Sequence, residues 1–327
     1  MSARWFAPWR AGLLSALVAL VLGLSGCSRE PAEPLRIGTN VWIGSEPLYL
    51  ARELGHLSPE AVRLVEYPSA SEVLRAFRNQ ALDGMVISLD EVLVLAADDL
   101  QPRIVLVVDV SHGADVVIGR SGMRTMRDLL GKRVAVESGA LGAYVLSRAL
   151  ALNQMQPSDV QIVHLESNEH PAAFEQGRVD AAVTFDPFRS RMVRSGASTL
   201  FDSTQIPGEI VDLLVVRGSV LEEDPQRVNA MLSGWFEALD YLERQPGDAA
   251  RRMSVRQQTS GEQFLQTLQG LRFPSREQNL KMLGGAVPDL AVAGRRLVDL
   301  MTQAKLLKRR VEVEALLAPD PLLSMPR

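Results

Sequence analysis

The sequence of 327 residues contains a single cysteine, Cys27. Without a second cysteine the chain cannot form internal disulfides or cysteine metal clusters, and the part that follows Cys27 has no thiol nucleophile. The signatures G-x-x-x-x-G-K-S/T, G-x-G-x-x-G, G-x-S-x-G and H-E-x-x-H are also absent. The four histidines are scattered, and we predict no metal site, no cofactor and no catalytic residue. A Ser-His-Asp site assembled from distant segments stays open, although no feature indicates one.

The sequence also lacks an excess of positive charge. It has 35 Lys and Arg against 39 Asp and Glu, a net charge of −4 and a pI near 5.7. Binding to nucleic-acid phosphates needs a concentrated basic face. No such face is visible in the sequence, so nucleic acid is not expected as a partner.

The first 26 residues are typical of an export signal. Arg4 and Arg10 accompany an apolar stretch over residues 11–24, which is shorter than the ~20 residues that span a bilayer. The letters LSGC at residues 24–27 resemble the lipobox of bacterial lipoproteins, in which the cysteine receives a diacylglyceryl group before cleavage. The resemblance implies removal of residues 1–26, lipidation of Cys27 and a linker to residue 34. An ordinary secretory signal with a chance cysteine is the alternative. We expect a protein on the periplasmic side of the cell envelope, anchored to a membrane through Cys27.

Short apolar runs alternate with amphipathic segments between Leu35 and Arg217, a pattern typical of parallel α/β sheets. Most runs are apolar nearly throughout, as in strands covered on both faces. The predicted strands are residues 35–38, 62–65, 84–88, 103–110, 115–118, 133–137, 161–165, 181–185 and 211–216.

The helices carry weaker signals at their ends. Ser71 and Asp90 are candidate N-caps. Beyond Asp224 the pattern becomes helical only, and Trp235 there is expected in the core. The Pro-rich segment 311–327 is predicted to be loosely held. The predicted C-terminal helices are residues 225–243, 248–256, 261–268, 275–282 and 290–304.

Four sequence blocks resemble the binding proteins of nitrate/sulfonate/taurine and thiamine-pyrimidine ABC importers. The first is RIGTNVWIG at residues 36–44, which runs into EPLYLA at 46–51. The others are LDG at 82–84 leading to Ser88, LGKRVAV at 130–136 and FEQGRVDAA at 174–182. Each block alone is weakly specific, but four in the right order over residues 35–217 are fairly specific.

The resemblance implies a type II periplasmic-binding-protein fold, in which two α/β lobes joined by two crossovers close on the ligand like a hinge. Lobe 1 would contain residues 35–108 and lobe 2 residues 109–210. Residues 211–327 would return to lobe 1 and add a helical C-terminal portion. The implied function is that of a substrate-binding lipoprotein of an ABC importer, not an enzyme. Its partners would be a permease and an ATPase, and a monomer is the simplest state for a hinge that opens and closes.

Ligand-binding residues are expected on loops after the strands, because open α/β sheets bind at the carboxyl ends of their strands. Trp42 offers a ring face, unless it only packs the lobe. Asp90 suits an N-cap as well as a ligand contact. For Asp186 an N-cap followed by Pro187 is the alternative to a ligand contact, and the resemblance implies a Glu where Asp186 stands. The small-residue turn at 137–142 presents amides to a ligand or is merely tight. The candidate ligand-binding residues are Trp42, Glu46, Ser88, Asp90, Glu137, Ser138, Gly139 and Asp186.

These candidates would give the cleft an acidic wall, with Arg189 as the nearest basic residue. An acidic wall disfavours small anions and favours amino or ring N–H donors. We therefore expect an aminopyrimidine or an amine as the ligand in preference to sulfonate or nitrate. Two other functions stay open. A ligand sensor that docks on a membrane signalling protein would use the same cleft. A pyrimidine-synthase relative would share the fold, although such enzymes carry a cysteine-rich segment that this chain lacks.

Overall fold

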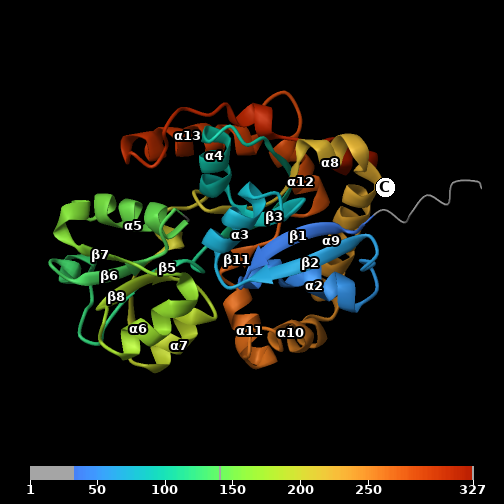
Figure 1. Ribbon diagram of the computed structural model, residues 1–327. Coiled ribbons are helices and arrows are strands. Elements are labelled where there is room, and N and C mark those ends of the chain that lie inside the picture. The colour runs from blue at the N-terminus through green and yellow to red at the C-terminus, as the bar shows by residue number, and fades with distance from the viewer. Residues whose placement is uncertain (1–32, 140, 326–327) are drawn as a thin grey trace, which may run out of the picture. The chain divides into compact units, whose positions relative to one another are not determined.

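The structure is a computed structural model that describes residues 33–139 and 141–325. Cys27 and the predicted export signal lie outside these residues. The unit that begins at Pro34 contains two β-sheets with helices around them (Figure 1). The α/β fold class expected from the sequence is confirmed.

The first sheet has six strands in the order β11-β4-β10-β3-β1-β2. β1 pairs in parallel with β2 and β3, whereas β10 is antiparallel to both β3 and β4. The strands are β1 (Leu35–Asn40), β2 (Val62–Tyr67), β3 (Gly84–Ser88), β4 (Pro102–Ser111), β10 (Val211–Arg217) and β11 (Leu271–Arg272).

The second sheet has five strands in the order β7-β6-β8-β5-β9. β6 is parallel to β7 and β8, and β5 is antiparallel to β8 and β9. The strands are β5 (Val116–Gly119), β6 (Arg133–Val136), β7 (Gln161–His164), β8 (Ala181–Thr184) and β9 (Ser198–Asp202).

Helices follow most of the strands along the chain. The α-helices are α2 (Glu46–Glu53), α3 (Ala70–Arg78), α4 (Leu89–Ala97), α5 (Leu141–Leu152), α6 (His170–Glu175), α7 (Phe188–Arg194), α8 (Gly218–Glu223), α9 (Pro225–Arg244), α10 (Pro246–Ser254), α11 (Gly261–Leu268), α12 (Arg276–Leu283), α13 (Asp289–Gln303) and α14 (Asp320–Ser324). None of the helices in the described part of the chain combines the length and the apolar character needed to cross a membrane.

The chain passes between the two sheets twice. β4 ends at Ser111 before β5 begins at Val116, and β9 ends at Asp202 before β10 begins at Val211. β4 and β10 are neighbouring antiparallel strands. Both connections therefore leave the first sheet side by side, an arrangement in which a few residues can serve as a hinge.

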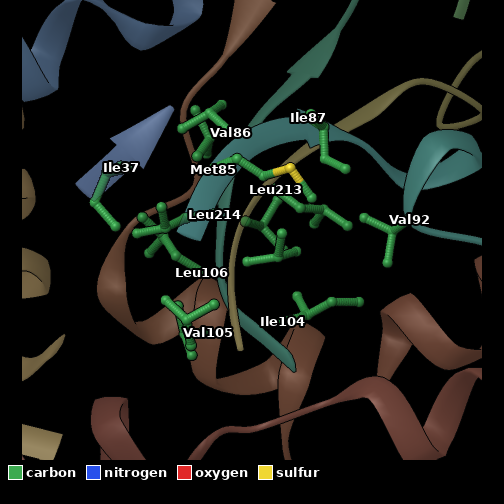
Figure 2. Packing of buried hydrophobic residues seen from close by; sticks show 14 of the residues in the cluster. Ile37, Met85, Val86, Ile87, Val92, Ile104, Val105, Leu106, Leu213 and Leu214 are labelled. Carbon is green, nitrogen blue, oxygen red and sulfur yellow. The ribbon is translucent and has the colours of Figure 1, made fainter. Parts of the chain in front are cut away.

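Alternation of side chains along the strands gives the second sheet two apolar faces. Val117 packs on the face that α5 covers, while Val116 and Ile118 pack with α6 and α7 on the opposite face. Figure 1 shows α5 on one side of the sheet and α6 and α7 on the other. In the first sheet, the central strands β3, β4 and β10 supply a continuous apolar core (Figure 2). Burial on both faces explains why these strands are apolar nearly throughout.

Both predicted N-caps are wrong by two residues. Ser69, not Ser71, caps α3, and its Oγ accepts a hydrogen bond from Glu72 N at 3.4 Å. Ser88, not Asp90, caps α4, and Ser88 N donates to Glu91 Oε2 at 2.9 Å. In both cases a Ser followed three residues later by a Glu forms the helix start, and each start shows at least one of the two bonds that this pattern allows.

Two predictions for the C-terminal part are also wrong. The region is not helical throughout, because β11 pairs with Ser111 and Val110 of β4. The segment after residue 311 is not loosely held. Leu322 is fully buried, and Ala318 N donates to Ile104 O at 2.9 Å. Apolar residues between the prolines bury this segment against the first sheet, which composition alone does not reveal.

Candidate ligand-binding site

A cavity lies where the ends of strands from both sheets meet. Its volume for a water-sized probe is about 50 Å³, and the cavity is partly open to solvent. One wall comes from the first sheet and its loops, the other from β8, the start of α5 and the start of α6. The lining residues are Asn40, Trp42, Ala70, Val86, Ile87, Ser88, Glu91, Asp115, Glu137, Leu141, Gly142, Val145, Ser167, His170, Val183, Thr184, Phe185 and Asp212.

The lining is acidic. Glu91, Asp115, Glu137 and Asp212 contribute carboxyl groups, and among the described residues no Lys or Arg lines the cavity. His170 adds no positive charge at neutral pH, because burial lowers its pKa to about 4. Arg189, the basic residue expected nearest, donates instead to Gly113 O at 3.1 Å. The cavity therefore has no cation on its wall to balance an anionic ligand.

Burial, more than any neighbouring charge, raises the pKa values of these carboxyls. It raises the pKa of Asp115 to about 7. The pKa of Glu91 reaches about 8, since the nearby Asp90 charge adds to the effect of burial. Burial also raises the pKa of Glu137. Near pH 7 part of this wall is protonated, and a bound cation would favour its ionised form.

Three strands place polar residues in one row beside the cavity. Ser88 of β3 lies opposite Asp212 of β10, and Asp212 lies opposite Asp109 of β4. Each is a polar residue in an apolar strand of the first sheet, and each is buried. The carboxyls of Asp109 and Asp212 share a hydrogen bond. Burial and the adjoining Asp109 charge hold the pKa of Asp212 well above its usual range.

The Ser88 end of the row continues into α4. Ser88 Oγ lies 2.6 Å from Asp90 Oδ1 and 2.9 Å from Glu91 Oε2. A hydroxyl has only one hydrogen to donate, so a protonated carboxyl must supply the second bond. Glu91 Oε1, by contrast, is buried and has no hydrogen-bond partner in the described structure. The same holds for Asp115 Oδ2 and Thr184 Oγ1. These three acceptors belong to residues that line the cavity.

Two aromatic rings meet across the cavity. Trp42 follows β1 and Phe185 follows β8; their ring centroids lie 5.2 Å apart at an interplanar angle of 89°. The indole Nε1 of Trp42 donates to Asp109 Oδ2 at 3.3 Å. Trp42 thus contacts the polar row at one point and the other sheet's domain at another.

Glu137 connects the two walls. It follows β6 of the second sheet, yet its Oε1 accepts a hydrogen bond from Ser71 N, in the first turn of α3, at 2.7 Å. Ser71 Oγ also lies 3.4 Å from Ser138 O, and Arg75 Nη2 lies 3.8 Å from Glu166 Oε1. A carboxylate at a helix N-terminus is favourable because the first amides there lack partners.

The other predicted site residues lie elsewhere. Glu46 does not line this cavity; its Oε1 accepts from Gln257 Nε2 at 2.6 Å. Asp186 Oδ1 accepts from Ser190 N at 3.1 Å, but Asp186 does not cap α7, whose N-cap is Pro187. It lies in a small separate pocket with Arg191. The remaining predicted residues, Asp90, Ser138 and Gly139, are near the cavity in sequence but do not line it. The structure thus brings Trp42, Ser88 and Glu137 together.

Sequence reasoning missed Glu91, Asp115, Thr184 and Asp212. A usable signal was present for the two aspartates, because each is a charged residue at the beginning of an otherwise apolar run. A buried charge needs a partner or a function. Among residues 33–139 and 141–325, no group of His, Cys, Asp and Glu is arranged to hold a metal ion.

The chain can now be compared with known proteins. The model of the NMT1-like family matches residues 28–257, more than two thirds of the sequence. The chain belongs to the NMT1-like family. This membership agrees with the resemblance expected from the four sequence blocks.

Curated relatives carry names of binding proteins. A putative aliphatic sulfonates-binding protein of Escherichia coli is 31% identical over 60% of this chain. The match covers 61% of that relative, so the chain spans less than two thirds of its length. A protein of the same name from Bacillus subtilis is 27% identical over 72% of this chain and 76% of its own length.

Solved structures show the same fold. The alkanesulfonate-binding protein SsuA from Xanthomonas axonopodis, bound to MOPS, superposes with a TM-score of 0.73 at 22% identity, covering 88% of this chain and 99% of that one. The desulfurization enzyme DSZB superposes with a TM-score of 0.66 at 15% identity, covering 89% and 98%. These superpositions establish the periplasmic-binding-protein fold expected from the sequence. The same fold also carries an enzyme.

Proposed function

We propose that this protein is the solute-binding component of an ABC importer and captures a small molecule in the cavity between its two sheets. Family membership, the names of the relatives and the cavity at the strand ends support this function. The observation that most directly supports a ligand in this cavity is the set of buried acceptors on its wall that have no hydrogen-bond partner. Buried polar atoms are normally hydrogen-bonded, so such a set indicates a partner that the protein itself does not supply.

The proposed ligand bears amino or ring N–H donors, as an amine or an aminopyrimidine does. Glu91 Oε1, Asp115 Oδ2 and Thr184 Oγ1 can each accept from such donors. A sulfonate would instead place its negative charge against the ionised carboxylates of this low-dielectric wall, where like charges repel strongly. In ligand preference the protein would therefore differ from the relatives named for sulfonates.

The aromatic pair supports a planar or cationic group. Trp42 and Phe185 both line the cavity and lie edge to face. Aromatic faces attract cations and stack on planar rings. Binding thus combines charge recognition on the carboxyl wall with a ring contact at the opposite end of the polar row.

Ligand capture would work by a population shift between open and closed forms. The contacts of Glu137 with Ser71 and of Arg75 with Glu166 join the two sheet domains. Arg191 Nη2 also donates to Gln258 Oε1 at 3.1 Å across the same boundary. A ligand that touches both walls stabilises the closed form, and only that form would present both surfaces to a permease.

The remaining expectations belong to the same proposal. Lipidation of Cys27 would hold the protein at the periplasmic face of a membrane. Permease and ATPase subunits would be the partners, and the protein would act as a monomer without catalysing a reaction. Lobe 1 would consist of residues 35–108 and the returning C-terminal part, and lobe 2 of residues 109–210.

A thermal-shift screen of residues 28–327 tests the proposal. Ligands that bind only the native state raise the melting temperature. We expect a shift with amines or aminopyrimidines, lost in Glu91→Gln and Asp115→Asn together. Asp159→Asn is the matched control, because Asp159 is only half-buried and does not line the cavity, and it should keep the full shift. A shift produced by nitrate or methanesulfonate alone would contradict the proposed ligand class.

A further inference from the structure

Asp109 occupies an unusual place beside the cavity. It does not line the cavity, yet it contacts two residues that do. Its Oδ2 accepts from the Trp42 indole at 3.3 Å, and its carboxyl shares a hydrogen bond with Asp212, its neighbour across β4 and β10. Asp109 is completely buried. It therefore links the aromatic end of the cavity to the acidic wall.

Gly44 makes this contact possible. A Cβ atom at residue 44 would lie 1.9 Å from Asp109 Oδ2 and 2.4 Å from Trp42 Nε1. Its backbone has no positive φ, so the requirement is space and not conformational freedom. Real side chains do not approach this closely, and even alanine would force the indole and the carboxylate apart. Residue 44 thus lacks a side chain that would block the bond between Trp42 and Asp109.

Asp109 also lies where the chain passes between the two sheets. Asp109 lies near the end of β4, and Asp212 lies near the start of β10, where the two connections between the sheets leave the first sheet. The indole of Trp42 meets Phe185 of the second sheet's domain. The bond to Asp109 therefore also fixes the orientation of the Trp42 ring in its contact with Phe185, which spans the cavity.

We propose that Asp109 is a positioning residue of the ligand site, which fixes the Trp42 indole over the space left by Gly44 and orients the Asp212 carboxyl toward the ligand. This inference rests on the proposed function, because the positioned residues would be the ligand contacts. Without Asp109, Trp42 would keep its apolar contacts but lose the bond that fixes its ring plane. Asp212 would lose its neighbour and turn freely.

Trp42 fluorescence tests the proposal without any ligand. Once residues 1–26 are absent, Trp42 and Trp235 are the only tryptophans, so Trp235→Phe makes Trp42 the sole reporter. In that background Trp42 is nearly inaccessible, since its residue is 5% exposed. We expect Asp109→Leu and Gly44→Ala to increase acrylamide quenching of Trp42 and to weaken its near-ultraviolet circular dichroism. Asp109→Asn should preserve both signals, because its amide oxygen still accepts from the indole.

The matched control is Asp115→Leu. Asp115 is equally buried and lines the cavity, but does not bond to Trp42. We expect it to leave Trp42 quenching unchanged. Equal quenching in the Asp109→Leu, Gly44→Ala and Asp115→Leu variants would overturn the proposal. If Asp109→Leu does not fold, Gly44→Ala and Asp109→Asn still decide it.

A binding measurement distinguishes a failure of this proposal from a failure of the proposed function. The probe is 4-aminopyrimidine, titrated by calorimetry. We expect Asp109→Leu to weaken binding about tenfold, in line with the loss of a hydrogen bond to a charged group, and Asp109→Asn to restore most of it. If the Trp235→Phe parent does not bind this probe, 4-aminopyrimidine is not a ligand of the proposed site, whereas the quenching comparison still decides the role of Asp109. If the parent binds and Asp109→Leu binds equally well, the positioning role is refuted.

Discussion

The hydrogen bond between Ser71 and Glu137 predicts how strongly the two sheet domains hold each other. Ser71 N donates to Glu137 Oε1 at 2.7 Å. Changing Ser71 to Pro removes this donor but keeps the helix start, since α2 and α6 already carry Pro47 and Pro171 at the second helical position. A hydrogen bond to a charged group contributes ~1.5–3 kcal/mol. Ligand affinity should therefore fall about tenfold to a hundredfold, because the closed form becomes that much rarer.

The assay combines calorimetry with spin-label distances. Labels at Val193→Cys and Val255→Cys lie on the two sides of the boundary, at exposed positions. We expect Ser71→Pro to lower the population of short distances at a given ligand concentration. Ser71→Ala is the matched control, because it keeps the backbone N–H that Ser71→Pro removes. It loses the side-chain contacts of Ser71 with Ser138 O at 3.4 Å and with the Glu137 carboxyl. Identical behaviour of the Pro and Ala variants would refute the reasoning.

Three further predictions concern protons and packing. Amine binding should favour the ionised carboxyls and release protons, so affinity should rise from pH 6 to pH 8; calorimetry in phosphate and Tris buffers counts the protons released. Without ligand, the folded protein holds protons that the unfolded chain has lost, because the pKa of Glu91 is about 8 and that of Asp115 about 7. Its free energy of unfolding, measured with urea, should therefore fall as the pH rises from 5 to 8, with a smaller fall in Glu91→Gln. Asn279→Leu should cost about 3 kcal/mol in the same assay, because buried Asn279 accepts from Val107 N at 2.7 Å and donates to Val107 O at 3.1 Å in β4. An unchanged pH profile in Glu91→Gln, or an Asn279→Leu protein as stable as wild type, would contradict these assignments.

Apolar runs made most of the fold predictable. Strands such as β3, buried on both faces, appear as uninterrupted apolar segments, and the predicted range 84–88 is the observed one. Helix α11 is likewise observed at the predicted residues. β9 and β11 were not predicted. β9 has a half-exposed, polar sequence, and β11 is only two residues long and depends on its partner β4. Whether such segments form strands depends on pairing with distant strands, and the local sequence does not show that pairing.

The site was predictable only in part, for a similar reason. The rule that ligands meet the carboxyl ends of strands located Trp42, Ser88 and Glu137, each directly after a strand or at its end. It missed Asp212, which stands at the start of an antiparallel strand and reaches the same edge from the opposite direction. The sequence analysis also misplaced the starts of α3 and α4, although the Ser-x-x-Glu pairs that begin at Ser69 and Ser88 were visible in the sequence.

Because the cavity wall is acidic, the ligand named for the relatives cannot simply be assigned to this chain. Two curated relatives named for aliphatic sulfonates are 31% and 27% identical to this chain over the matched residues. The fold does not set the ligand, because specificity resides in the residues that line the site. Here those residues include four carboxyls and, within the described chain, no Lys or Arg.

A matched-pair titration tests the central claim most directly. Calorimetry at pH 8 would compare amines with the sulfonates of the same carbon skeletons, ethylamine with ethanesulfonate and 2-phenylethylamine with 2-phenylethanesulfonate. Each pair differs only in its charged group, so the comparison isolates the electrostatics of the cavity wall. The account predicts binding of at least one amine and of neither sulfonate. Binding of a sulfonate in preference to its matched amine would contradict it.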